Sequence, residues 1–373
     1  MPRNLVVCCD GTANQIFAGD DTNVVRLCAV AIKAPDRQII YYGPGLGTME
    51  AEGALTWIGR AWTRLAGLAL GYGIANDIAK AYAFIVANYQ PGDRVYLFGF
   101  SRGAYTARAV ASLLKLYGHL RIGNEALIPY IVRELLHFDA PFAYILQRVA
   151  PDRLKKRVDE KFAKARETRK TFATREVKPH FVGVWDTVSS VGWFFSPTRI
   201  PYTAVNSDIE VGRHALALDE RRAFFIRNLW QFDPTQPAKG PLNIKEVWFA
   251  GVHCDIGGGY RESQSGLAKL ALEWMLREAE QHQLLIDDAA RQRVLGEAGQ
   301  GRVRPNPNAK MHNSMTGLWF LAEFVPLVSG LRGKLRINFF RRRIVPSGAL
   351  IHESVFRRNG YDRPLPPEHR IER

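Results

Sequence analysis

Apolar residues form short uninterrupted runs that alternate with stretches of helical periodicity. The runs at 4–9, 38–42 and 94–100 are bounded by glycine-containing turns, which predicts buried strands. Residues 71–89 and 104–118 instead carry apolar side chains at helical spacing, and the second stretch ends at a glycine. This order of strand and helix predicts an α/β fold with a mostly parallel sheet and helices on its faces.

Further along the chain the core pattern is interrupted once and then resumes. Residues 121–178 are rich in Lys and Arg and show little apolar periodicity, so we expect a basic helical insertion or lid there. The apolar core pattern resumes at 181–188 and 247–260, and residues 265–283 predict an amphipathic helix.

One serine lies on the turn between the strongest predicted strand and the strongest predicted helix. The segment Gly99-Phe100-Ser101-Arg102-Gly103 fits the pattern G-x-S-x-G of the nucleophile elbow. Such a serine adopts a strained backbone conformation, so the positions two residues before and after it must lack bulk. An ordinary strand-to-helix turn with small residues is the alternative. We predict that Ser101 is the nucleophile of an α/β-hydrolase.

A nucleophilic serine needs a base, and the base needs an acid to orient it. Asp186 follows the apolar run FVGVW, and His253 follows another strand-like run. These strand-end positions, in the chain order Ser, Asp, His, make them the predicted acid and base. Asp255 and Asp10 are rival acids. The other histidines have weaker settings: His214 in a helix-like stretch, His312 and His352 in loop-like segments, and His119, His137, His180, His282 and His369 without a strand-end position.

An oxyanion hole requires two backbone N–H donors. We expect one from Arg102, directly after the nucleophile, and the other from Gly11-Thr12 in the turn after the first strand. This chemistry requires no cofactor. The sequence therefore predicts one α/β-hydrolase-like domain over 1–373, with a cap-like extension over 300–373.

Composition and charge indicate which partners and which cellular compartment the protein suits. The chain has 373 residues, 47% of them hydrophobic, and a net charge of +15. The charge favours anionic surfaces such as phospholipid headgroups. The four cysteines, Cys8, Cys9, Cys28 and Cys254, form no zinc or disulfide pattern. We expect synthesis in the reducing cytoplasm, because the N-terminus has no signal-peptide pattern. The apolar segment 317–330 is too short and too interrupted for a transmembrane helix.

Several segments together resemble a known family. They are DGTANQ (10–15), YYGPGLGT (41–48), PGDRVYLFGFSRGAYTAR (91–108), VWDTV (184–188), HALALDE (214–220), VWFAGVHCDIGGGY (247–260) and, more weakly, IHESVFRR (351–358). This set resembles an uncharacterised α/β-hydrolase domain family that includes the phospholipase effectors of bacterial type VI secretion, with relatives in fungi. The resemblance implies a Ser–Asp–His hydrolase with Ser101, Asp186 and His253 in those roles. It also implies a lipid or other ester substrate and export by type VI secretion. The basic surface and the aromatic segments predict peripheral membrane association as the other possibility.

Other classes fit less well. A haloacid dehalogenase phosphatase would need an aspartate where Cys8 stands, and 43–47 departs from the dinucleotide-binding spacing. A metal site on His253, Asp255 and Asp10 lacks a recognised ligand spacing. No nucleic-acid-binding motif accompanies the positive charge, so no nucleic acid partner is expected.

A catalytically silent module that binds an anionic membrane or a protein partner is the main alternative. The basic insertion and the aromatic segments 191–195 and 317–330 would then form the docking surface. We expect those two segments to pack in the core instead, because exposed apolar patches are uncommon.

Overall fold

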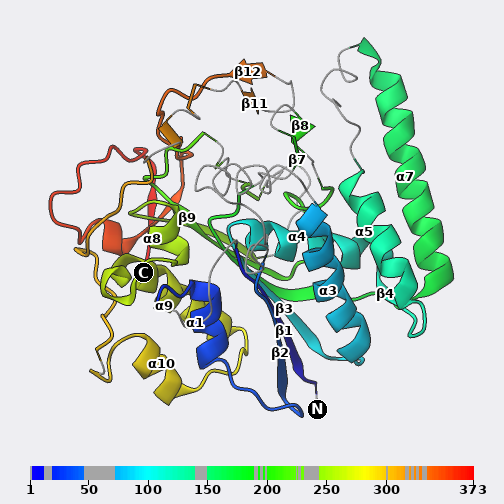
Figure 1. The fold of residues 1–373 in the computed structure, drawn as a ribbon, viewed down its shortest axis with the longest axis horizontal. Helices are drawn as coiled ribbons and strands as arrows, with labels where there is room; N and C mark the ends of the chain where they lie inside the picture. Colours follow the sequence, from blue (N-terminus) through cyan, green and yellow to red (C-terminus); the bar gives the residue numbers. More distant parts are fainter. Residues whose placement is uncertain are drawn as a thin grey trace, which may run out of the picture.

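A parallel β-sheet forms the centre of the computed structural model. Its strands are β1 (Asn4–Cys9), β2 (Gln38–Gly43), β3 (Arg94–Phe100), β6 (Pro179–Trp185), β9 (Val211–Ala217), β10 (Asn243–Phe249), β13 (Leu350–His352) and β14 (Arg370–Glu372). The eight strands lie in the order β14-β13-β10-β9-β6-β3-β1-β2, and every neighbouring pair is parallel (Figure 1). The fold is thus of the α/β-hydrolase-like class that the sequence predicts.

The structure describes most of the chain. The described residues are 2–11, 19–45, 72–138, 149–188, 192–193, 196–197, 200–223, 225, 228–230, 243–299, 301–315, 319–320, 323–324, 327–329 and 334–373.

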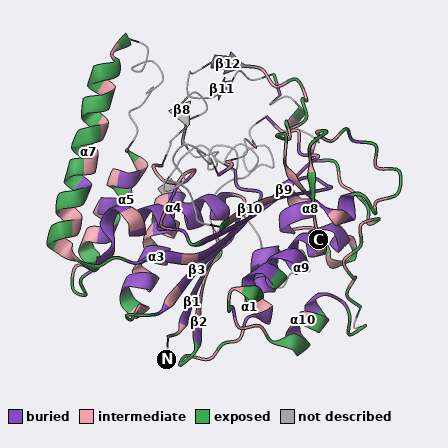
Figure 2. Cartoon of the chain, turned by 180° about the vertical axis from the view of Figure 1, so that it is seen from behind, coloured by how far each residue is buried: buried purple, intermediate pink, exposed green. Residues whose placement is uncertain are grey.

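Helices cover both faces of the sheet, because alternate strand residues point to opposite sides. Val7 and Cys9 of β1 pack in one apolar cluster with α3 (Tyr72–Asn88) and α4 (Arg102–Tyr117). Val6 and Cys8 pack in a second cluster on the opposite face. That cluster contains α1 (Asn23–Val30), α9 (Gly266–Gln281) and α10 (Asp288–Val294). The inner strands β1, β3, β6 and β9 are buried almost throughout (Figure 2), as expected of continuous apolar runs.

One predicted element has a different structure. The stretch around His214 was expected to be helix-like, and it forms the buried strand β9 between β6 and β10. All seven residues of β9 are buried, so neither face carries the polar alternation that marks a half-exposed strand. A short run of this kind cannot be distinguished from helix by periodicity alone.

The basic region 121–178 contains the helices α5 (Ile128–Leu136) and α7 (Pro151–Phe172). Only Ala165 is buried in α7, whose outer surface is exposed along its length (Figure 2). The helix packs against α4 on one side of the sheet (Figure 1). Its function as a lid remains a prediction.

The C-terminal region contributes to the central sheet through β13 and β14. The remaining short strands pair among themselves: β4 (His119–Leu120) with β5 (Ala173–Arg175), β7 (Gly192–Trp193) with β8 (Ser196–Pro197), and β11 (Leu327–Ser329) with β12 (Lys334–Arg336). A cap-like function for 300–373 remains a prediction.

The aromatic segment 317–330 differs from expectation where it is described. Phe320 and Phe324 are 52% and 48% exposed rather than packed in the core. Between them, the buried Glu323 carboxylate accepts hydrogen bonds from the Ala223 and Phe340 amides, at 2.5 and 3.0 Å. The segment thus buries the hydrogen-bonded Glu323 side chain, and the rings of Phe320 and Phe324 lie at the surface. Most of 191–195 lies outside the described residues. No helix in the described part of the chain is long and apolar enough to cross a membrane.

Candidate active site

Ser101 lies on a strained turn between β3 and α4. Its backbone angles are φ 58° and ψ −120°, a left-handed conformation that non-glycine residues rarely adopt. A methyl group on Gly103 would lie 2.1 Å from the Cys9 carbonyl oxygen, and one on Gly99 would lie 2.4 Å from the Gly103 carbonyl oxygen. Both positions therefore exclude larger residues, for the steric reason that the sequence pattern implies. The half-buried Ser101 is thus held at the carboxyl end of β3.

The structure brings Asp186 and His253 together. Asp186 follows β6, and His253 begins the short helix α8 (His253–Gly257) after β10. An Asp186 carboxylate oxygen lies 2.5 Å from His253 Nδ1, and both side chains are buried. A carboxylate only accepts hydrogen bonds, so Nδ1 carries the proton and Nε2 is left as the basic nitrogen.

Two contacts place Ser101 beside this pair. The Ser101 amide donates to the carbonyl of Trp185, the residue before Asp186, at 3.1 Å. The ring of Phe100, the residue before Ser101, lies 4.6 Å from the His253 ring. The Phe225 ring lies 4.7 Å from the imidazole, at an interplanar angle of 76°. The three predicted residues therefore share one edge of the sheet, where aromatic rings fix the plane of the histidine.

A second partner of Asp186 was not predicted from the sequence. Arg343 donates from Nη1 to one carboxylate oxygen at 2.5 Å and from Nη2 to the other at 3.1 Å. The same guanidinium also donates to the carbonyls of Ala217 and Phe225. The Ala217 amide adds a third donor to the carboxylate, at 3.0 Å. The sequence signal was the basic run 341–343, but nothing local shows which arginine reaches the acid.

These contacts set the charge states of the pair. Burial alone would raise the pKa of Asp186, but the charge of Arg343 and the bond to His253 outweigh it and hold this pKa well below its usual range. Burial lowers the pKa of His253, and the bond to Asp186 opposes that shift only in part. At neutral pH the site therefore holds an ionised carboxylate and a neutral imidazole, the form in which a histidine acts as a base.

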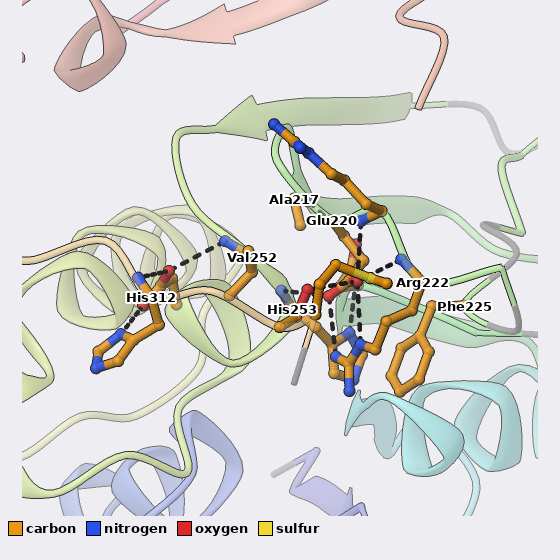
Figure 3. A network of polar contacts seen from close by, with 12 residues as sticks. Ala217, Glu220, Arg222, Phe225, Val252, His253 and His312 are labelled. Atoms are coloured by element: carbon orange, nitrogen blue, oxygen red, sulfur yellow. Dashed lines mark hydrogen bonds and ion pairs between the residues drawn. The ribbon is translucent and has the colours of Figure 1, made fainter. Parts of the chain in front are cut away.

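The buried Glu220 carboxylate connects the backbone of His253 to the Arg222 side chain (Figure 3). It accepts the His253 amide at 3.2 Å and binds Arg222 through both carboxylate oxygens, at 3.0 and 2.9 Å. Burial opposes its ionisation, but the hydrogen bond and charge of Arg222 outweigh burial and lower the pKa of Glu220 to about 2.

The predicted oxyanion donors are placed as follows. Arg102 is the first residue of α4, and its amide lies at the helix N-terminus directly after Ser101. Gly11 lies beside the turn, and its amide donates to the Asp10 carboxylate at 2.6 Å. Thr12 lies outside the described residues. Burial raises the pKa of Asp10 to about 6, against the hydrogen bonds that it accepts from Thr22 and Tyr42.

The rival groups have other partners. His214 accepts the Thr187 amide at Nε2 and contacts Glu246 through Nδ1, so both of its ring nitrogens are engaged. The rival acid Asp255 lies 2.6 Å from His312 Nδ1, not beside His253. Within the described residues, no group of three or more His, Cys, Asp or Glu side chains is arranged to hold a metal ion.

Comparisons with known proteins identify relatives of this chain. Uncharacterized protein YEL023C of Saccharomyces cerevisiae is 32% identical over 232 residues, which are 60% of this chain and 32% of the yeast protein. The chain thus spans about a third of the length of that relative. A crystal structure of an uncharacterized protein from Pseudomonas aeruginosa superposes with a TM-score of 0.43 and 18% identity, covering 78% of this chain and 47% of that one.

A structure of the Tle1 effector bound to the VgrG spike of the type 6 secretion system superposes with a TM-score of 0.33 and 16% identity. It covers 71% of this chain and 52% of the effector. The family model described as "T6SS, Phospholipase effector Tle1-like, catalytic domain" matches residues 3–278, so that Arg343 lies beyond the matched part. Since this match includes most of the chain, the protein belongs to the family of Tle1-like phospholipase effector catalytic domains.

Proposed function

We propose that the chain is a serine hydrolase that cleaves acyl esters of phospholipids, with Ser101 as nucleophile, His253 as base and Asp186 as the orienting acid. The observation that carries the proposal is the 2.5 Å contact between Asp186 and His253, beside a serine held in a strained turn. Membership of a phospholipase family supports a lipid ester as the substrate.

The reaction follows from these assignments. The Ser101 oxygen attacks the ester carbonyl while His253 Nε2 takes the hydroxyl proton. The tetrahedral intermediate collapses, and the imidazolium gives that proton to the leaving alcohol, which leaves an acyl group on Ser101. His253 then takes a proton from water, whose oxygen attacks the acyl carbon. The second intermediate releases the fatty acid and returns the proton to Ser101. Asp186 stays ionised throughout and stabilises the imidazolium.

The oxyanion of both intermediates needs N–H donors. We assign these to the Arg102 amide and the Gly11-Thr12 turn. The Gly11 amide is bonded to Asp10, so its contribution requires that this bond be shared or released when substrate binds. The first turn of α4 adds its positive dipole end to the same position.

We also propose where the protein acts and what it binds, from its surface and from its family. A net charge of +15 and the exposed rings of Phe320, Phe324 and Phe339 suit peripheral binding to an anionic membrane. Export by a type VI secretion system is proposed from the family alone. The alternative, a membrane-binding module without catalysis, is favoured by the same basic and aromatic surface.

Hydrolysis by matched variants tests the proposal. Wild type, Ser101→Ala and His253→Ala would be assayed on a short acyl ester and on phospholipid vesicles. The controls are Ser263→Ala and His137→Ala, which change exposed residues of the same types. We expect turnover to fall by about three orders of magnitude or more in the two site variants and to persist in the controls. Undiminished turnover by folded Ser101→Ala would contradict the assignment, and vesicle binding without hydrolysis by wild type would favour the alternative.

A further inference from the structure

A pocket of about 440 Å³ opens beside the candidate active site. Its lining includes Arg222, Tyr260, Lys310, Met311, His312 and Trp319. Cys254, which follows His253, also lines it. Glu220 bonds both the His253 amide and the Arg222 guanidinium, so one buried carboxylate joins the pocket wall to the base (Figure 3). The pocket therefore adjoins the backbone of the candidate base.

Arg222 is held in a fixed orientation toward this space. Glu220 takes its Nε and Nη2 donors, and the guanidinium lies 3.5 Å from the Phe225 ring centre and 5.2 Å from that of Trp319. A guanidinium has five N–H groups, of which Glu220 uses two. The remaining edge can donate to a second oxyanion with little loss of side-chain entropy, since the plane is already fixed.

The carboxylates near the pocket lie behind its lining. Glu220 and Asp255 are 0% and 1% exposed, and neither lines the pocket. Asp255 instead holds His312, whose ring stacks on Tyr260 at 3.6 Å. The exposed Lys310 lines the pocket directly. The surface that a ligand meets thus presents cations and N–H donors beside aromatic rings.

We propose that this pocket binds the phosphodiester group of the phospholipid substrate, which rests on the function proposed above. Arg222 and Lys310 bind the phosphate oxygens, as charge-assisted donors do. Tyr260, Met311 and Trp319 cover the less polar glycerol part. Phosphate bound here places the glycerol esters on the His253 side. Inorganic phosphate would bind the same donors. A lipid headgroup should bind more tightly than inorganic phosphate, because its glycerol part makes additional contacts.

The test combines kinetics and binding. Lys310→Glu is compared with wild type, with Lys310→Arg as the charge-conserving variant and with Lys156→Glu, on the exposed surface of α7, as the charge-matched control. The substrates are monomeric dihexanoyl phosphatidylglycerol and dihexanoylglycerol, which lacks the phosphate. We expect Lys310→Glu to raise KM for the phospholipid about tenfold and to leave KM for the neutral lipid unchanged. Lys310→Arg should restore the wild-type value, and Lys156→Glu should keep it.

Equal changes on both substrates, or an equal effect of Lys156→Glu, would overturn the proposal. Calorimetric titration with glycerophosphoglycerol provides a readout without catalysis, in which Lys310→Glu should weaken binding about tenfold. If wild type cleaves neither lipid, the proposed function fails, and this titration alone decides on the pocket. Absence of binding to wild type overturns the site. Inorganic phosphate that binds as tightly as the diester overturns the assignment to a lipid headgroup.

Discussion

Replacement of Arg343 by alanine should destabilise the protein strongly, because it leaves a buried carboxylate without its cation. Asp186 is fully buried and the Arg343 side chain is 7% exposed, so solvent screens their attraction little. The variant retains only His253 and the Ala217 amide as partners of that carboxylate. Removal of one member of a buried ion pair costs about 3–5 kcal/mol of unfolding free energy. We expect a loss in that range at neutral pH.

Urea unfolding followed by fluorescence would measure this loss, with Arg341→Ala, an exposed arginine of the same run, as the matched control. The pH dependence supplies a second test. The folded pKa of Asp186 is lowered, so its contribution is fully present above the unfolded value near 4 and is lost as the pH falls below it. The difference between wild type and Arg343→Ala should therefore be largest at neutral pH and shrink below about pH 4.

A double-mutant cycle tests whether the loss of stability arises from the interaction of Arg343 with Asp186. In an Asp186→Asn background the Arg343→Ala change should cost clearly less, because the charge that Arg343 balances is gone. If Arg343→Ala destabilises the wild type no more than Arg341→Ala does, or costs the same in both backgrounds, the role assigned to this ion pair is wrong.

Three further predictions concern the same sheet edge. Gly103→Ala should lower the unfolding free energy by about 1–3 kcal/mol, because its methyl group would lie 2.1 Å from a backbone oxygen of Cys9; an unchanged thermal midpoint would contradict this. The acid limb of kcat/KM should have its midpoint below 6.5, since burial lowers the pKa of the base His253, and a midpoint above 6.5 in a pH-rate profile would oppose the assignment. Burial raises the pKa of Asp10 to about 6, so the folded chain binds a proton there more tightly than the unfolded chain. Urea unfolding should show wild type losing stability relative to Asp10→Asn as pH rises from about 4 to 6, with no further loss above that, whereas a constant difference would refute it.

The sheet and the turn that holds Ser101 are predictable from local patterns. The strands β1 and β3 follow uninterrupted apolar runs, and α4 begins and ends near the expected residues. The strained turn at Ser101 also agrees with the two glycines of the motif, because a methyl group at either position would lie within 2.4 Å of a backbone oxygen. Local sequence suffices here because the strand, the turn and the helix are contiguous.

Contacts between distant segments were harder to predict. The pairing of Asp186 with His253 was inferred from strand-end positions and chain order, and the family resemblance implied the same roles. Arg343 reaches the same carboxylate from a loop 157 residues further along, and its neighbours Arg341 and Arg342 are exposed. The strand β9 was missed because burial on both faces removes the alternation that distinguishes strand from helix.

Covalent labelling with a fluorophosphonate probe, followed by peptide mass mapping, tests directly whether Ser101 is the activated nucleophile. Such a probe reacts with a serine only where a base and an oxyanion hole activate it. We expect one adduct, on Ser101, that disappears in His253→Ala although Ser101 is still present. An adduct on another serine, or an intact folded protein that the probe does not label, would contradict it.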